Sequence, residues 1–197
     1  MSVIKLLCYC LLALSLVACG GDGRQWHARD ISGLMPVLSF ELTGETGRPV
    51  AAEDYRGKVV MLFFGFTHCP HFCPATLSKL SQALDLLPAG ERDEVRILFV
   101  SIDPARDSLE DIDTYTDNFA PEVFGLTASE ARLRDFAKRY RTTFSYGEPD
   151  ENGNYDVSHG LAVYVFDREG KARLMILEQQ TVEQIATDLR QLLAVTP

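Results

Sequence analysis

The sequence lacks a cluster of basic residues, and beyond its amino terminus it lacks any long apolar run. Its 19 Lys and Arg residues are scattered among 28 Asp and Glu residues, which gives a net charge of −9 and a pI near 4.9. Because phosphate binding needs a concentrated positive field, we expect no nucleic-acid partner. A membrane-spanning helix needs roughly 20 apolar residues, and no later segment supplies them.

Internal repeats and low-complexity segments are also absent. With 46% apolar and 24% charged residues among its 197, the chain has the composition of a globular protein. One compact domain is therefore expected.

Cysteine is sparse and unevenly placed. Of five cysteines, Cys8, Cys10 and Cys19 fall within the first twenty residues, whereas Cys69 and Cys73 lie close together near the middle. The two groups therefore call for separate explanations.

The first group belongs to an apparent export signal. An apolar run over residues 6–17 follows Lys5, and this order of charge and apolar residues is typical of a signal peptide. The run ends in LVAC at 16–19, which resembles the bacterial lipobox. Cleavage before Cys19 would leave that cysteine to carry acyl chains. A plain signal peptide with an incidental cysteine is the alternative.

The lipobox interpretation predicts three parts. Residues 1–18 would be the signal peptide, 19–34 a lipidated tether and 35–197 the folded domain. Acyl chains hold a protein on a membrane that it does not cross. We therefore expect a bacterial lipoprotein on the cell membrane, facing the periplasm or the extracytoplasmic side.

The folded part alternates strand and helix patterns, as in an α/β protein with a central sheet flanked by helices. A polar segment at 142–157 predicts an inserted hairpin. Predicted strands cover 37–42 and 48–50, which form an amino-terminal hairpin, and 59–66, 95–102, 161–166 and 171–177. Predicted helices cover 74–87, 109–119, 130–140 and 181–193.

The strongest chemical signal is the segment GFTHCPHFCP at 65–74, where a buried strand turns into a helix. The N–H groups and dipole of a helix amino terminus favour the thiolate, which is both a nucleophile and a metal ligand. Thiolates about 2.3 Å from one metal lie roughly 4 Å apart, a separation that Cys69 and Cys73 can reach. The same spacing also permits a disulfide.

Two other interpretations of this cysteine pair remain open at this point. An inert disulfide would suit an exported protein, although a link across so few residues constrains the unfolded chain little. Peroxidases of this general fold place a nucleophilic cysteine after such a strand. Their usual Thr-x-x-Cys arrangement is absent, because the order here is Thr67, His68, Cys69.

A third metal ligand would have to come from the four histidines. Two thiolates favour Cu(I) or zinc, and an added imidazole also permits Cu(II). His27 lies in the expected tether, His68 and His71 flank Cys69, and His159 directly precedes a predicted buried strand. By itself, a lone histidine such as His159 is better interpreted as a hydrogen-bonded loop or capping residue.

Three blocks of the sequence resemble the Sco/SenC family of thioredoxin-like copper proteins, which help to assemble cytochrome c oxidase. The blocks are GFTHCPHFCP at 65–74, VSIDPARD at 100–107 and VSHG at 157–160. The resemblance covers roughly residues 35–193. It implies a thioredoxin-like sheet with an inserted hairpin, and a copper site, Cu(I) or Cu(II), built from Cys69, Cys73 and His159.

His71 departs from the usual family sequence, and Asp103 and Asp107 each have two possible roles. The residue after Cys69 and Pro70 is commonly acidic in the family but is His71 here, which is either a further ligand or a solvent-facing substitution. Asp103 and Asp107 either cap a turn and a helix or support the metal loop from behind.

The resemblance implies a non-enzymatic metallochaperone that delivers copper to the dinuclear copper site of cytochrome c oxidase. Its partners would be the copper-bearing oxidase subunit, together with other copper chaperones or thiol reductants. Two alternatives use the same residues. One is a thiol–disulfide oxidoreductase that reduces the cysteines of that site, with Cys69 attacking and Cys73 resolving; the other is a copper or redox sensor. Thioredoxins have a cis-proline loop where this chain has Ser158, His159 and Gly160, which favours the chaperone.

Overall fold

The computed structural model describes residues 25–194. The expected signal peptide at 1–18 and the expected lipidation at Cys19 lie outside the described residues. Within 25–194, no helix has both the length and the apolar character needed to cross a membrane.

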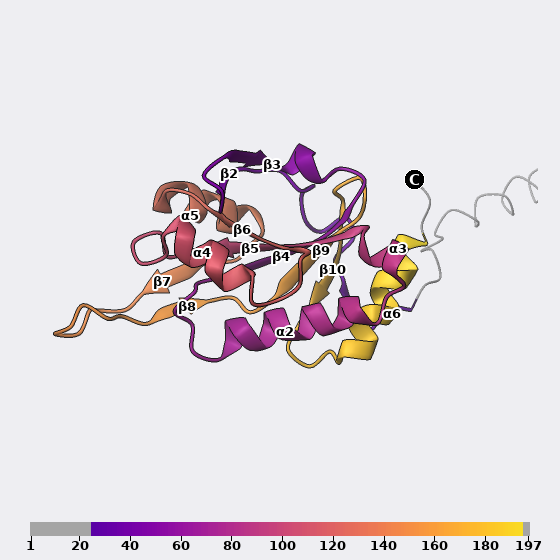
Figure 1. The fold of residues 1–197 in the computed structure, drawn as a ribbon. Helices are drawn as coiled ribbons and strands as arrows, with labels where there is room; N and C mark the ends of the chain where they lie inside the picture. The colour runs from indigo at the N-terminus through magenta and orange to yellow at the C-terminus, as the bar shows by residue number, and fades with distance from the viewer. Residues whose placement is uncertain (1–24, 195–197) are drawn as a thin grey trace, which may run out of the picture.

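An eight-stranded sheet forms the centre of the protein (Figure 1), in the order β1-β10-β9-β4-β5-β6-β2-β3. The three middle strands β4, β5 and β6 run parallel, and β9 and β2 pair antiparallel on either side of them. The strands are β1 (Arg29–Asp30), β2 (Glu41–Gly44), β3 (Pro49–Ala51), β4 (Val59–Gly65), β5 (Val95–Ser101), β6 (Val123–Thr127), β9 (Val163–Phe166) and β10 (Ala172–Ile176).

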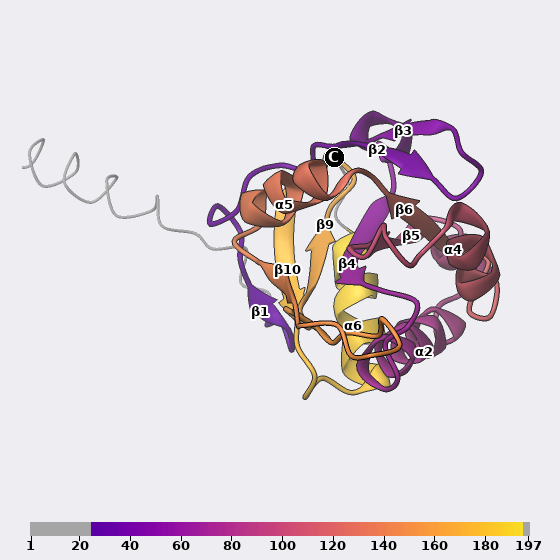
Figure 2. The same cartoon turned by 90° about the vertical axis from the view of Figure 1, so that its left-hand side faces the viewer.

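Helices cover both faces of this sheet (Figure 2). On one face, α2 and α6 pack on strand residues such as Met61 and Phe63. On the other face, α5 packs on Leu62 and Phe64. Successive strand side chains point to opposite faces, so a strand covered on both sides needs a continuous apolar run, which β4 has. The helical segments are η1 (Ala52–Tyr55), α2 (Phe72–Asp85), α3 (Ala89–Arg92), α4 (Leu109–Thr116), α5 (Glu130–Arg139) and α6 (Val182–Leu193).

The inserted hairpin is a separate two-stranded sheet of β7 (Phe144–Tyr146) and β8 (Val157–His159). It projects from the same end of the molecule as the start of α2 (Figure 1). His159 is the last residue of β8 and pairs with Phe144. The hairpin therefore includes His159, whereas the sequence analysis placed it ahead of that residue.

The central sheet, both hairpins and the flanking helices confirm the predicted architecture. Strand β6 was not predicted, because Val123–Thr127 is short and has a glycine in its centre. Helix α2 begins two residues before Pro74, which thus lies within the first turn, where a missing N–H removes no helical bond.

The second half of the expected tether differs from the prediction, because it is packed on the domain. The amide groups of His27 and Ala28 donate to the carboxylate of Asp188 at 3.0 and 2.7 Å. Strand β1 then pairs antiparallel with β10. Asp188 is 1% exposed, and a buried carboxylate is stabilised when N–H groups hydrogen-bond to it.

Candidate metal centre

Cys69 and Cys73 occupy the turn from β4 into α2. Both are buried free thiols, and Cys73 is fully buried in the first turn of the helix. The amide N–H of Cys73 donates to the sulfur of Cys69 at 3.4 Å. A helix amino terminus has N–H groups without helical partners, and here one of them points at a potential ligand.

His159 reaches the same place from the hairpin. Its Nδ1 lies 2.9 Å from the carbonyl oxygen of Gly160. A carbonyl can only accept, so Nδ1 carries the proton and Nε2 is left with its lone pair. That Nε2 lies 3.7 Å from Sγ of Cys73. The ring sits edge-on between Phe66 and Phe63, with centroids 5.8 and 6.2 Å away.

Burial sets the protonation of Cys73 and of the partly buried His159. It lowers the pKa of His159, so the imidazole stays neutral at neutral pH. It also raises the pKa of the Cys73 thiol, which corrects the expectation that the helix amino terminus biases this cysteine toward the thiolate. Cys73 is too far inside the protein for the helix end to compensate for lost hydration. A metal ion must therefore displace a proton from Cys73.

The structure brings together the three residues that the resemblance implied. The ligand atoms of Cys69, Cys73 and His159 all lie within 4.8 Å of one another. Sulfur and nitrogen ligands about 2.1 to 2.3 Å from one metal are separated by roughly 4 Å, which fits this arrangement. Two soft sulfurs with one imidazole suit Cu(I) and zinc and also permit Cu(II).

The other histidines stay outside this group. His71 is exposed, and it belongs to no ligand cluster among the described residues. The side chain of His68 is half exposed, and its Nδ1 lies 3.1 Å from Asp107 rather than beside the thiols. His27 lies in the amino-terminal segment that packs on Asp188.

Asp107 supports the metal loop from behind. It is 3% exposed, and it accepts hydrogen bonds from the N–H and hydroxyl of Thr67 at 2.8 and 2.6 Å. The cap of α4 is Ser108 instead. Of the two interpretations left open for Asp107, the structure favours support of the loop.

Sequence analysis missed the residues that hold the hairpin. Tyr155 donates to the buried carboxylate of Asp103 at 2.6 Å, and the guanidinium of Arg106 lies 3.7 Å from the centre of the Tyr155 ring. One signal was available, since Tyr155 is the one aromatic residue in the polar stretch at 147–156.

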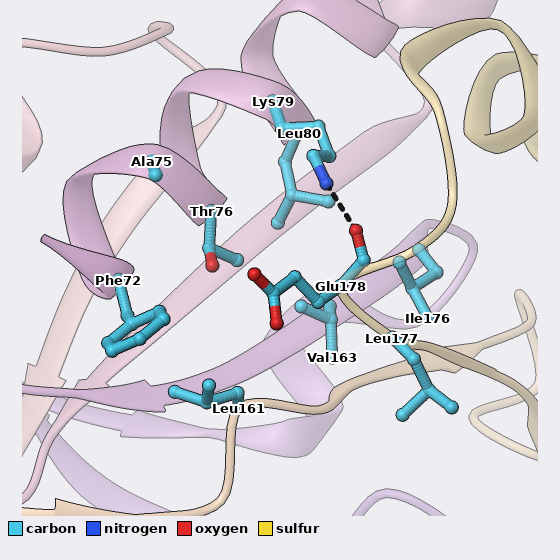
Figure 3. A pocket seen from close by; sticks show the side chains of 10 residues that line it. All are labelled: Phe72, Ala75, Thr76, Lys79, Leu80, Leu161, Val163, Ile176, Leu177 and Glu178. Atoms are coloured by element: carbon cyan, nitrogen blue, oxygen red, sulfur yellow. Dashed lines mark hydrogen bonds between the residues drawn. The ribbon is translucent and has the colours of Figure 1, made fainter.

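A small apolar pocket lies between α2 and the ends of β9 and β10 (Figure 3). Phe72, Leu80, Leu161 and Leu177 contribute to its wall, and Lys79 donates across it to the backbone carbonyl of Glu178. None of the three candidate ligands lines it, so it is distinct from the metal centre.

Comparison with known proteins identifies relatives that match most of this chain. Residues 35–194 match the family described as SCO1/SenC. The bovine protein "Protein SCO2 homolog, mitochondrial" is 35% identical over 156 residues, which cover 79% of this chain and 59% of the relative. The chain thus spans less than two thirds of the length of that relative.

Two solved structures are similar in sequence and fold. Copper-bound ScoI from Bradyrhizobium japonicum is 31% identical, with a TM-score of 0.72, and the match covers 79% of this chain and 98% of that one. Apo Sco1 from Thermus thermophilus is 32% identical, with a TM-score of 0.76, and the match covers 87% and 99%. The thioredoxin-like fold expected from the resemblance is confirmed. Because the family match extends over most of the sequence and over every strand of the central sheet except β1, the chain belongs to the SCO1/SenC family.

Proposed function

We propose that this protein is a copper metallochaperone, which binds one copper ion through Cys69, Cys73 and His159 and delivers it to the dinuclear copper site of cytochrome c oxidase. The observation that carries this proposal is the convergence of two thiols and one imidazole within 4.8 Å. The copper bound to the ScoI relative supports the choice of metal.

Ligand exchange is the mechanism. The neutral His159 offers Nε2 at once, whereas Cys73 gives up its proton as the metal binds. Incoming thiolates of the acceptor then replace Cys69 and Cys73 one at a time, and no electron transfer is required. Oxidation of the pair to a disulfide removes both sulfur ligands, so delivery depends on the redox state of the pair.

Attachment to a membrane is part of the same proposal. The lipobox-like LVAC at 16–19 supports acylation at Cys19 after removal of residues 1–18. Acyl chains on Cys19 would hold the copper domain beside a membrane-bound acceptor. The copper-bearing subunit of the oxidase is the proposed partner.

Thiol–disulfide exchange is the second candidate, and it is favoured by the closeness of two free thiols, since the amide N–H of Cys73 reaches Sγ of Cys69 at 3.4 Å. In that reaction Cys69 attacks an acceptor disulfide and one acceptor thiolate leaves. Cys73 then attacks the mixed disulfide and releases the second acceptor thiolate. Two electrons pass to the acceptor, and a Cys69–Cys73 disulfide remains.

The deciding experiment is a copper titration of the reduced full chain in detergent. Replacing Cys8, Cys10 and Cys19 by serine leaves Cys69 and Cys73 as the only thiols. Cu(I) and Cu(II) are titrated separately, and stoichiometry and thiolate-to-copper charge-transfer absorption are recorded for this protein and for its His159→Ala variant. His27→Ala is the matched control, because the hydrogen bonds of His27 to Asp188 and Gln180 are made by its backbone N–H and carbonyl.

We expect one ion per chain, with Cu(II) binding severely weakened in His159→Ala and unchanged in His27→Ala. Absence of tight copper binding in the reduced protein would overturn the assignment as a copper chaperone. Binding that is indifferent to His159 would also overturn it, and both results would shift the assignment to disulfide exchange.

A further inference from the structure

The metal centre is assembled from two parts of the chain that do not pair with each other. Cys69 and Cys73 follow the central strand β4, whereas His159 ends a hairpin that forms its own sheet. Something must fix the hairpin relative to the cysteine loop if all three ligands are to stay together. The turn at 103–107, which follows β5, contacts both parts.

On the cysteine side, this turn acts through Asp107. Its Oδ2 accepts from the amide of Thr67 at 2.8 Å and from the hydroxyl of Ser101 at 2.6 Å. Its Oδ1 accepts from the hydroxyl of Thr67 at 2.6 Å. Thr67 is two residues before Cys69, so a fully buried carboxylate side chain fixes the start of the loop.

On the histidine side, the turn acts through Asp103 and Arg106. The Nε of Arg106 donates to Asp103 at 2.6 Å, and its Nη1 donates to the backbone carbonyl of Tyr155 at 2.9 Å. The guanidinium also stacks on the Tyr155 ring, whose hydroxyl donates to the other oxygen of Asp103. Tyr155 lies just before β8, so these contacts hold the strand that ends in His159.

We propose that the turn at 103–107 is a positioning element of the metal centre, in which Asp107 fixes the cysteine loop while Asp103 and Arg106 fix the hairpin that presents His159. The ligand set is thereby assembled before the metal arrives. This inference rests on the proposed copper site and explains how an imidazole on a projecting hairpin stays in reach of the two thiols.

The test uses variants that loosen the hairpin without touching a ligand. Arg106→Gln removes the cation that stacks on Tyr155, together with the hydrogen bonds from the guanidinium to Asp103 and to the Tyr155 carbonyl. Arg106→Lys keeps the positive charge but not the planar guanidinium. Tyr155→Phe removes only the hydroxyl that donates to Asp103. Arg92→Gln is the matched control. Arg92 also pairs with a buried carboxylate, Glu122, but it lies on α3, at the opposite end of the molecule from the hairpin (Figure 1).

Two readouts are measured on the full chain in detergent, with Cys8, Cys10 and Cys19 replaced by serine. The first is the affinity for Cu(II) relative to Cu(I), because Cu(I) is satisfied by two thiolates whereas Cu(II) needs the imidazole. The second is amide hydrogen exchange at 157–160 in the metal-free protein, which reports hairpin opening without any metal.

For Arg106→Gln we expect Cu(II) affinity to fall about tenfold or more, the usual effect of losing a partner of a metal ligand, with a shifted charge-transfer band and little change for Cu(I). Exchange at 157–160 should accelerate while exchange in β4 and β5 does not. Arg106→Lys should retain part of the Cu(II) affinity that Arg106→Gln loses. Tyr155→Phe should lower Cu(II) affinity less than Arg106→Gln does, and Arg92→Gln should leave it unchanged.

Unchanged Cu(II) affinity and unchanged exchange in Arg106→Gln would overturn the inference. If Arg106→Gln fails to fold, Tyr155→Phe decides by the same two readouts. If the parent protein binds no copper, the proposed function fails, and exchange at 157–160 still decides whether Arg106 holds the hairpin.

Discussion

The Nε2 of His159 faces the Sγ of Cys73 at 3.7 Å, although 86 residues separate them in the chain. The imidazole is neutral and the thiol is buried, so this contact joins a donor S–H to a lone pair in the metal-free protein. A copper ion would replace that proton between the same two atoms. Ligands of one metal ion lie roughly 4 Å apart, so the separation of these two atoms suits a shared copper ion.

Because Gly65 has no side chain, the sulfur of Cys73 can pack directly against its backbone. A Cβ at this position would lie 2.9 Å from Sγ of Cys73 and 2.6 Å from the Phe99 ring. We expect Gly65→Ala to lower the free energy of unfolding by about 1 to 3 kcal/mol through overpacking, and to weaken copper binding because Sγ must move. Chemical denaturation and copper titration measure the two effects.

Gly90→Ala is the control for that substitution. Gly90 lies in α3, where an added Cβ meets nothing within 4 Å. Alanine is the better helix former, so stability should be equal or higher. Equal copper affinity in Gly65→Ala and the parent would contradict the prediction.

Copper loading should release protons. Since burial raises the pKa of Cys73 and lowers that of His159, at pH 7 the thiol holds its proton and the imidazole contributes none. At least one proton then leaves per copper bound, and apparent affinity rises about tenfold or more per pH unit. Calorimetric titrations in two buffers with different heats of ionisation count these protons. The count should fall in Cys73→Ala, and equal heats in both buffers would refute the prediction.

The metal-free protein should lose stability in mild alkali. The Cys73 pKa is raised above 9.0, chiefly by burial, so the folded state keeps a proton that the unfolded chain gives up. The stabilisation is complete below pH 9 and decreases by about 1.4 kcal/mol per pH unit above it. Denaturation between pH 9 and 10 measures this slope. Tyrosines whose pKa values are also raised from 10.0 add to it in the parent, so the contribution of the thiol is the difference between the parent and Cys73→Ala.

Cys73→Ala provides the comparison for the alkaline slope. The variant lacks the titrating thiol, so its free energy of unfolding should change less between pH 9 and 10. Identical slopes in variant and parent would show that another group is responsible.

Asp188 should anchor the amino-terminal segment. Its two oxygens accept the N–H groups of His27 and Ala28, and asparagine offers one acceptor in their place. We expect Asp188→Asn to cost about 1 to 3 kcal/mol, the usual penalty for leaving a buried donor unpaired. Amide exchange at positions 27 and 28 should accelerate. Asp85→Asn, which alters an exposed ion pair with Arg92, should have little effect. Unchanged amide exchange at positions 27 and 28 in Asp188→Asn would show that Asp188 does not anchor this segment.

Local pattern in the sequence was sufficient for most strands of the sheet and for the cysteine loop. The continuous apolar run of β4 predicts a strand buried on both faces, and Cys69 and Cys73 follow it directly, so their proximity depends only on one turn. Strands β1 and β6 escaped prediction because they are short and owe their conformation to pairing with β10 and β5.

The sequence by itself determined the fold class, the cysteine pair and, through the resemblance, the choice of His159. Only the tertiary structure decided that burial would keep a proton on Cys73, that Asp107 would fix the cysteine loop and that Arg106 would hold Tyr155. These outcomes arise from the approach of segments that are distant in the chain, and hydration and hydrogen bonding at such contacts depend on how the elements pack rather than on local residue order.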